Sequence, residues 1–161
     1  MDRTESVFII SLFLALILVP GTVLATSVTF NPSFVYGNPP SNGYVLLNFD
    51  NTNNNEDAVA TIALGATRDP LYAIYIPAGE IGTIENMGSG RFDVFLTLGT
   101  EFDAKNRTFS DAKYYKITSP LIVTGKQEEQ TVLLYAKDGT VNRIKEITAD
   151  EAPVYNKQIR K

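Results

Sequence analysis

The sequence predicts an all-β fold, an antiparallel β-sandwich of eight or nine short strands that follows an N-terminal signal helix. Three observations support this prediction. Short runs with apolar residues at every second position recur along the chain, clusters of Gly, Pro, Asn and Asp separate them, and no segment beyond the N-terminus has a helical period. A closed β-barrel fits the same pattern and is the second choice.

The N-terminus has the features of an export signal. Residues 7–19 form thirteen apolar or small positions, and Val23 and Ala25 provide the small residues that signal peptidase accepts at its cleavage site. The pattern therefore predicts a signal peptide over residues 1–25, cleaved after Ala25.

An uncleaved membrane anchor over residues 7–25 is the alternative. This segment just reaches the ~20 apolar residues that a transmembrane helix needs. In addition, a signal peptide usually begins with a net positive charge, but here Asp2 and Glu5 balance Arg3 and the amino terminus. Pro20 near the end of the segment favours cleavage. In both cases the folded part is expected outside the cytoplasm, either secreted or anchored at the cell surface.

The first strands follow a turn-rich segment at residues 26–42, in which only residues 28–30 have a strand-like pattern. Alternation then predicts strands over residues 43–49, 58–64 and 71–76. In the first of these, Tyr44, Leu46 and Asn48 share one face and Val45, Leu47 and Phe49 share the other, and we expect it to be the first core strand. In the third, Tyr72 and Tyr75 fall on opposite faces.

The most regular strand is expected over residues 91–98. A turn at residues 77–79, a short strand and a second turn at residues 88–90 precede it. Its apolar face consists of Phe92, Val94, Leu96 and Leu98. Because side chains alternate between the two faces of a strand, we expect this face to be buried.

Another strand is expected over residues 113–123, where Pro120 limits it to a sheet edge or a bulge. Further along, Asp138-Gly139 is the signal of a two-residue type I′ turn, which predicts a hairpin of residues 131–137 and 140–147.

The β-sandwich domain is therefore expected to span residues 43–147. Residues 148–161 have mixed charges and a proline and are expected to form a C-terminal tail, with one short helical turn at residues 149–152.

Composition excludes several functions. The net charge is −4 and the chain has no long basic run, so nucleic acid is not an expected partner. It has no Cys, His or Trp, which removes disulfides, thiol nucleophiles and the commonest general base and metal ligand. We expect no cofactor, no catalytic residues and no metal site.

Residues 50–57 contain many side-chain oxygens, which raises the alternative of a calcium-dependent adhesion domain. A calcium loop of the familiar type has a central glycine and a late bidentate acid. Here Asn55 and Thr61 occupy those positions. We therefore interpret the segment as a solvated hairpin loop.

A hydrolase that uses carboxylates alone is the second alternative function. Glu101 and Asp103 could form an acid/base pair, although Lys105 and Arg107 beside them favour ordinary loop charges. The full set of candidate carboxylates is Glu80, Glu85, Asp93, Glu101 and Asp103. In the same loop, Asn106 begins an Asn-Arg-Thr sequence and is a candidate N-glycosylation site.

The region of residues 43–122 resembles a small extracytoplasmic β-sandwich module of uncharacterised secreted or membrane-tethered prokaryotic proteins. The resemblance is carried by an Asp-Ala-Val strand at residues 57–59, a Gly-x-aromatic strand beginning at Gly90, a Thr-x-Gly turn at residues 97–99, and the loop aromatic Phe102. There is also a weaker similarity to carboxypeptidase-regulatory or transthyretin-like domains. The resemblance implies an extracytoplasmic location and a sandwich fold, and no enzymatic activity.

The leading functional hypothesis is a non-enzymatic secreted or cell-surface module that binds a protein or a glycan, or acts structurally. Its candidate contact residues are Phe102, Phe109, Tyr114 and Tyr115. These aromatic side chains could form an exposed patch, or they could fill the end of the sandwich core.

Overall fold

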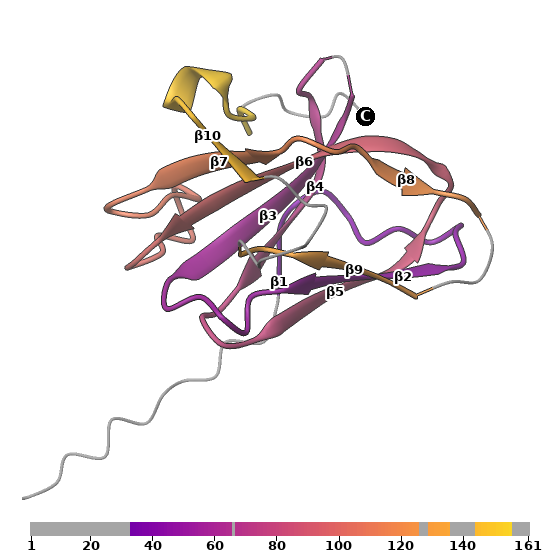
Figure 1. The fold of residues 1–161 in the computed structure, drawn as a ribbon, viewed down its shortest axis with the longest axis horizontal. Coiled ribbons are helices and arrows are strands. Elements are labelled where there is room, and N and C mark those ends of the chain that lie inside the picture. The colour runs from indigo at the N-terminus through magenta and orange to yellow at the C-terminus, as the bar shows by residue number, and fades with distance from the viewer. Residues whose placement is uncertain (1–32, 66, 126–128, 136–143, 156–161) are drawn as a thin grey trace, which may run out of the picture.

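The all-β sandwich is confirmed by a computed structural model that describes residues 33–65, 67–125, 129–135 and 144–155. Two sheets pack face to face (Figure 1). The larger sheet contains β1 (Ser33–Tyr36), β3 (Asp57–Leu64), β4 (Pro70–Ile76), β6 (Gly90–Gly99), β7 (Lys113–Ile117), β8 (Leu121–Val123) and β10 (Ile144–Ile147). The smaller sheet contains β2 (Val45–Asp50), β5 (Ile81–Met87) and β9 (Glu129–Leu133).

The strand order explains which segments are central. In the larger sheet the order is β1-β4-β3-β6-β7-β10, with β8 also paired to β6, so β3 and β6 lie in the middle. In the smaller sheet β2 lies between β5 and β9. All pairings are antiparallel except that of β2 with β9, which is parallel, so the smaller sheet is mixed.

The core lies between the two sheets and follows the predicted alternation. The expected first core strand is confirmed as β2, and its Val45, Leu47 and Phe49 side chains are almost completely buried. The predicted apolar face of β6 meets them; Phe92, Val94 and Leu96 are buried and Leu98 packs against the same cluster. The inner face of the larger sheet is thus held by burial of large apolar side chains.

The central strand β3 is buried on both faces. Ala58, Ala60 and Ile62 point into the core, whereas Val59 belongs to a second apolar cluster on the opposite side of the sheet. We call this opposite side the outer face. A strand buried on both sides needs a covering layer on each, so something other than the smaller sheet must cover the outer face.

The interpretation of residues 50–57 as a solvated hairpin loop is wrong, because β2 and β3 lie in different sheets. Asn51 is completely buried at this crossing. Its Nδ2 donates to the carbonyls of Glu56 at 3.1 Å and Pro77 at 3.0 Å, and its Oδ1 accepts from Asn54 Nδ2 at 2.6 Å. The polar residues satisfy backbone groups where the chain changes sheets.

The predicted hairpin is also wrong over the residues that the structure describes. β9 pairs with β2 in the smaller sheet and β10 pairs with β7 in the larger one. Asp138 and Gly139 themselves lie outside the described residues. An Asp-Gly pair favours a local turn, but the pairing of the flanking strands depends on burial, and β9 next to β2 buries Val132.

Both ends of the described chain add elements. β1 forms within the turn-rich segment, where no strand was predicted over residues 33–36, and pairs with β4. The predicted helical turn is confirmed as the 3-10 helix η1 (Ala149–Glu151). Thr148 N donates to the Glu151 carboxylate at 2.9 Å and closes that turn.

The expected signal peptide, its cleavage site after Ala25 and the possible strand at residues 28–30 lie outside the described residues. Within the described part of the chain we find no helix of the length and hydrophobicity that crossing a bilayer requires.

Candidate binding cleft on the outer face

An aromatic layer covers the outer face of the larger sheet. Val59, Ala73, Tyr75 and Phe109 are buried there, and Phe102 packs against them. The Tyr75 ring stacks on Phe102 with centroids 4.7 Å apart, and Phe102 lies 5.1 Å from Phe109. The layer joins two strands of the sheet to the loop of residues 100–112.

The polar end of Tyr75 is satisfied within this layer. Its hydroxyl donates to the Asp57 carboxylate at 2.5 Å, and the Ala78 N–H donates to the same carboxylate at 2.9 Å. Burial, together with the neighbouring Asp57 charge, raises the pKa of Tyr75 far above its usual value. Tyr75 therefore stays neutral and acts as a structural anchor.

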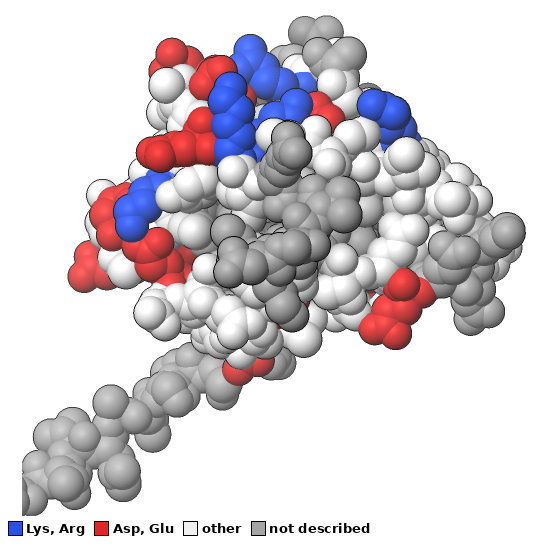
Figure 2. Space-filling model, in the orientation of Figure 1, with Lys and Arg blue, Asp and Glu red and all other residues white. Residues whose placement is uncertain are grey.

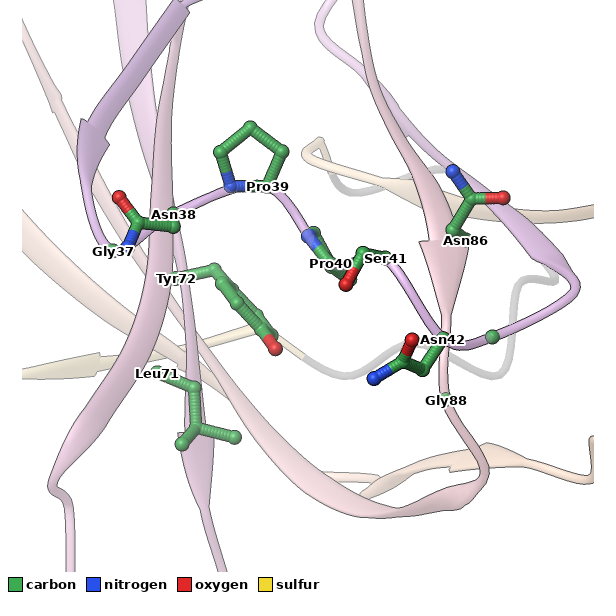
Figure 3. A pocket seen from close by; sticks show the side chains of 11 residues that line it. Gly37, Asn38, Pro39, Pro40, Ser41, Asn42, Leu71, Tyr72, Asn86 and Gly88 are labelled. Carbon is green, nitrogen blue, oxygen red and sulfur yellow. The ribbon is translucent and has the colours of Figure 1, made fainter.

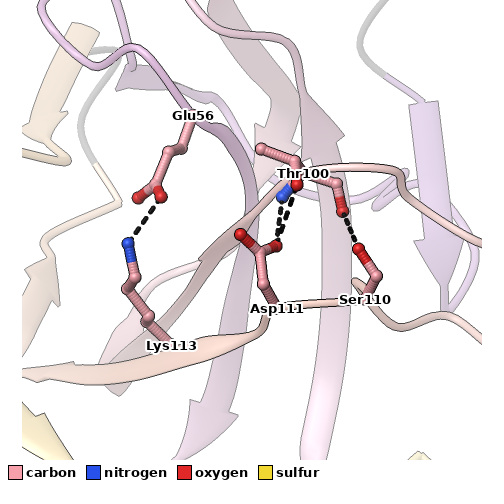
Figure 4. Close-up of polar contacts among 5 residues, drawn as sticks. All are labelled: Glu56, Thr100, Ser110, Asp111 and Lys113. Carbon is pink, nitrogen blue, oxygen red and sulfur yellow. Dashed lines mark hydrogen bonds and ion pairs between the residues drawn. The ribbon is translucent and has the colours of Figure 1, made fainter.

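Short polar contacts fix the base of the 100–112 loop (Figure 4). Asp111 accepts from Thr100 N at 2.7 Å and from Thr100 Oγ1 at 3.1 Å, and Lys113 pairs with Glu56 at 2.6 Å. Donation from the Thr100 backbone lowers the pKa of Asp111. Phe109 then packs against Gly99, where a Cβ atom would lie only 2.5 Å from the Phe109 Cβ.

The tip of the loop is organised by Asp103. Its carboxylate accepts from Lys105 N at 2.8 Å, Asn106 N at 3.1 Å and Asn106 Nδ2 at 2.6 Å. These hydrogen bonds, that from the Asn106 backbone above all, lower the pKa of Asp103. Arg107 adopts a left-handed φ of 55°, which a non-glycine residue adopts only where its surroundings hold it. The loop tip therefore has a defined shape.

The C-terminal segment docks beside this loop. The Tyr155 hydroxyl lies 2.6 Å from Thr61 Oγ1, on the buried outer side of β3, and its ring lies 5.5 Å from that of Tyr36. Burial raises the pKa of Tyr155. The Arg107 guanidinium lies over the Tyr36 ring at 5.8 Å, so Tyr36 connects the loop to the segment.

A cleft of about 340 Å³ lies between the loop tip and the C-terminal segment. Its floor includes Thr97 and Tyr114, which pair directly across β6 and β7. The loop contributes Lys105, Asn106, Arg107 and Thr108, and the opposite wall contains Pro153, Val154 and Tyr155. The cleft combines cations, amide and hydroxyl groups with an apolar wall, which suits a small polar ligand.

The four predicted contact residues do not form one patch. Phe109 is buried and Phe102 is partly buried in the outer aromatic layer, whereas Tyr115 packs against the core between the sheets. Only Tyr114 lines the cleft. Tyr114 and Tyr115 point to opposite sides because they are neighbours in a strand.

The candidate carboxylates are scattered. Asp93 pairs with Lys116 at 2.7 Å, Asp103 holds its own loop, and Glu80, Glu85 and Glu101 are exposed. None of the five lines the cleft. Among the described residues no three Asp or Glu side chains gather closely enough to hold a metal ion.

The glycosylation candidate Asn106 is exposed and lies on the cleft wall. A glycan attached to its Nδ2 would project from the same side chain that borders the cleft, so glycosylation and ligand binding would compete for this space.

A second groove, of about 460 Å³, lies between residues 37–43, the start of β4 in the larger sheet and the end of β5 in the smaller sheet (Figure 3). Tyr72, Asn42 and Asn86 line it together with Pro39 and Pro40. All its lining residues are uncharged. It therefore lacks the charge that distinguishes the outer-face cleft.

Comparison of the chain with protein-family models, with curated proteins and with solved structures finds no match in any of the three. We therefore infer the function from the geometry of the cleft and from the sequence.

Proposed function

We propose that the protein is a non-enzymatic, extracytoplasmic β-sandwich module that binds a glycan at the cell surface through the outer-face cleft. The observation that carries the proposal is the cleft itself, where Asn106, Tyr114 and Tyr155 converge from a loop, a strand and the C-terminal segment. Amide and hydroxyl groups pair with sugar hydroxyls, and a phenol ring packs against the C–H face of a sugar.

The size of the cleft favours a saccharide over a folded protein. At about 340 Å³ it lies near the lower end of the range for small-ligand sites, roughly 300–1,000 Å³. A stable protein interface buries about 800 Å² on each partner and is usually flatter.

Binding rather than catalysis is supported by the ionisable groups present. The cleft contains Lys105, Arg107, Tyr114 and Tyr155, and no carboxylate. The raised pKa of Tyr155 keeps that phenol neutral near pH 7. Such groups orient a ligand but provide no general acid and base pair of the usual kind.

The extracytoplasmic location is supported by the N-terminal sequence alone, through the apolar run at residues 7–19 and the small residues before Ala25. Mass spectrometry of the protein recovered from its host will show a mature N-terminus at Thr26. A full-length mass would instead favour the membrane anchor.

A glycan array probed with wild-type protein and Tyr114→Ala tests the binding function. We expect wild type to retain a defined set of oligosaccharides and the variant to lose about tenfold or more in affinity, as for an aromatic hot spot. Tyr44→Ala is the matched control, since Tyr44 is 74% exposed, precedes β2 and lies outside the cleft. Equal binding by Tyr114→Ala and wild type, or no glycan retained by wild type, would contradict the proposal.

A further inference from the structure

The charges of the cleft distinguish it from the rest of the molecule. Lys105 and Arg107 both line it, and its lining includes no Asp or Glu. The chain as a whole has a net charge of −4, so a site with two cations and no carboxylate is unusual for it.

Both cations are available to a ligand. The ion pairs among the described residues join Lys113 to Glu56 and Lys116 to Asp93, and neither Lys105 nor Arg107 takes part in them. The nearest acid in the loop, Asp103, already accepts three N–H donors from its own turn.

A second cavity on the outer face provides a contrast. It is lined by Arg68, Lys116 and Lys145 but also by Glu151, and Lys116 is paired with Asp93. In Figure 2, Lys and Arg side chains lie among Asp and Glu at the end of the molecule that carries β7 and β10. In that cavity the cations share the lining with a carboxylate, whereas the described residues that line the cleft include none.

From this geometry we propose that the ligand of the cleft is an acidic saccharide, with a uronic acid carboxylate bound by Arg107 and Lys105. The inference rests on the proposed glycan-binding function and specifies its ligand. Arg107 is held over the Tyr36 ring, and its planar guanidinium can donate two parallel hydrogen bonds to a carboxylate. Lys105 adds a second positive charge from the same loop tip.

The remaining lining fits the rest of a sugar residue. Asn106 and Thr108 supply polar groups for sugar hydroxyls, while Tyr114 and Pro153 supply apolar surface for a ring face. The volume of about 340 Å³ is suited to a short terminal unit more than to a long enclosed chain.

The test compares binding of one uronic acid oligosaccharide with that of the same oligosaccharide after its carboxyl groups are reduced to alcohols. Isothermal titration calorimetry of the full chain will show at least about tenfold weaker binding of the reduced form, which corresponds to loss of a charge-assisted hydrogen bond pair. Raising the salt concentration will weaken only the acidic form.

Variants at Arg107 assign the effect to the cleft. Asn tolerates the left-handed backbone conformation of this position, so Arg107→Asn removes the charge and keeps the loop shape. We expect it to lose most of the preference for the acidic form, because only Lys105 remains, and Arg107→Lys to keep a larger part of the preference. Arg91→Gln, an exposed change on β6 outside the cleft, is the charge-matched control and will keep the full preference.

The outcomes separate the two proposals. Equal wild-type binding of the acidic and reduced forms overturns the acidic ligand but leaves glycan binding intact, whereas binding of neither overturns both. A preference that survives in Arg107→Asn with Lys105→Gln places the site elsewhere and overturns the inference. Equal binding of inorganic polyphosphate overturns it in favour of a general anion site. If the variants fail to fold, the comparison of the two sugars with wild type still decides.

Discussion

The two faces of the larger sheet are covered in different ways. The inner face meets the smaller sheet through aliphatic and Phe side chains such as Phe49, Ile62 and Leu96, all with at most 1% of their surface exposed. The outer face is covered by a loop and the C-terminal segment through aromatic rings, hydroxyl groups and charges. One face is held by burial of closely packed apolar side chains, the other by individual anchoring contacts.

The inner face therefore contributes mainly to the stability of the fold, and the outer face provides the groups that can contact a ligand. A close-packed apolar layer specifies one fold but offers no polar group to a ligand. The outer layer has fewer buried residues, and its hydrogen bonds, at Asp103, Asp111 and Tyr155, hold polar side chains in place around an open cleft. We therefore expect substitutions on the inner face to unfold the domain and those on the outer face to act more locally.

The largest expected effect is that of Phe49→Ala. The Phe49 side chain is completely buried between the sheets, so its truncation will cost about 3–5 kcal/mol of unfolding free energy. Phe102→Ala removes the same ring from the outer layer, where Phe102 is only partly buried, and will cost about 1–2 kcal/mol. Urea unfolding followed by circular dichroism measures both. Equal costs for the two variants would mean that the layers form one cooperative core.

The inner face could be predicted from the sequence because its signal is local. The alternation of Phe92, Val94 and Leu96 depends only on strand geometry and burial, and the structure confirms that this face is buried. The turn at residues 149–152 was equally local. Such patterns need no knowledge of which strands are partners.

Pairing partners were harder to predict. The Asp138-Gly139 signal concerns two residues, but β9 pairs with β2 and β10 pairs with β7, so the two strands belong to different sheets. The loop after β2 looked solvated since it is polar, although Asn51 is buried where it holds three backbone carbonyls. The polarity of a side chain does not by itself show whether it forms hydrogen bonds with water or with backbone groups.

The cleft could be predicted only in part. Tyr114 was identified from its aromatic character, but Tyr115 and Phe109 have the same character and lie elsewhere. The contribution of Tyr155 depends on a hydrogen bond to Thr61 across 94 positions of sequence, which no local pattern contains. An isolated tyrosine in a tail after Pro153 was the one signal available for it.

Tyr155→Phe tests how the outer layer holds the C-terminal segment. The change leaves the Thr61 hydroxyl, which is 1% exposed, without this partner and will cost about 1–2 kcal/mol. Hydrogen exchange will show faster exchange at residues 148–155 than in β2 and β3. Replacing both partners, with Thr61→Val and Tyr155→Phe, will cost less than the sum of the single changes. Additive costs in this cycle would show that the hydrogen bond contributes nothing.

The smallest expected effect is a pH dependence confined to the outer layer. The pKa values of Asp103 and Asp111 are lowered from 3.8 by N–H donors, so the folded state binds these protons less tightly than the unfolded chain does. Their stabilising contribution is complete above about pH 5 and is lost as the pH falls below 3.8 and through the lower folded values.

Amide hydrogen exchange measures this loss. The amides of Lys105 and Asn106, corrected for the intrinsic pH dependence of exchange, will lose protection over this pH range. Asp103→Asn will reduce the pH dependence, and the amides of Leu47 and Phe49 in β2 will not respond, because no Asp or Glu among the described residues is buried in the core. Protection of the Lys105 amide that persists to pH 2 would show that the carboxylate does not hold the loop tip, and the cleft would then depend on the aromatic layer alone.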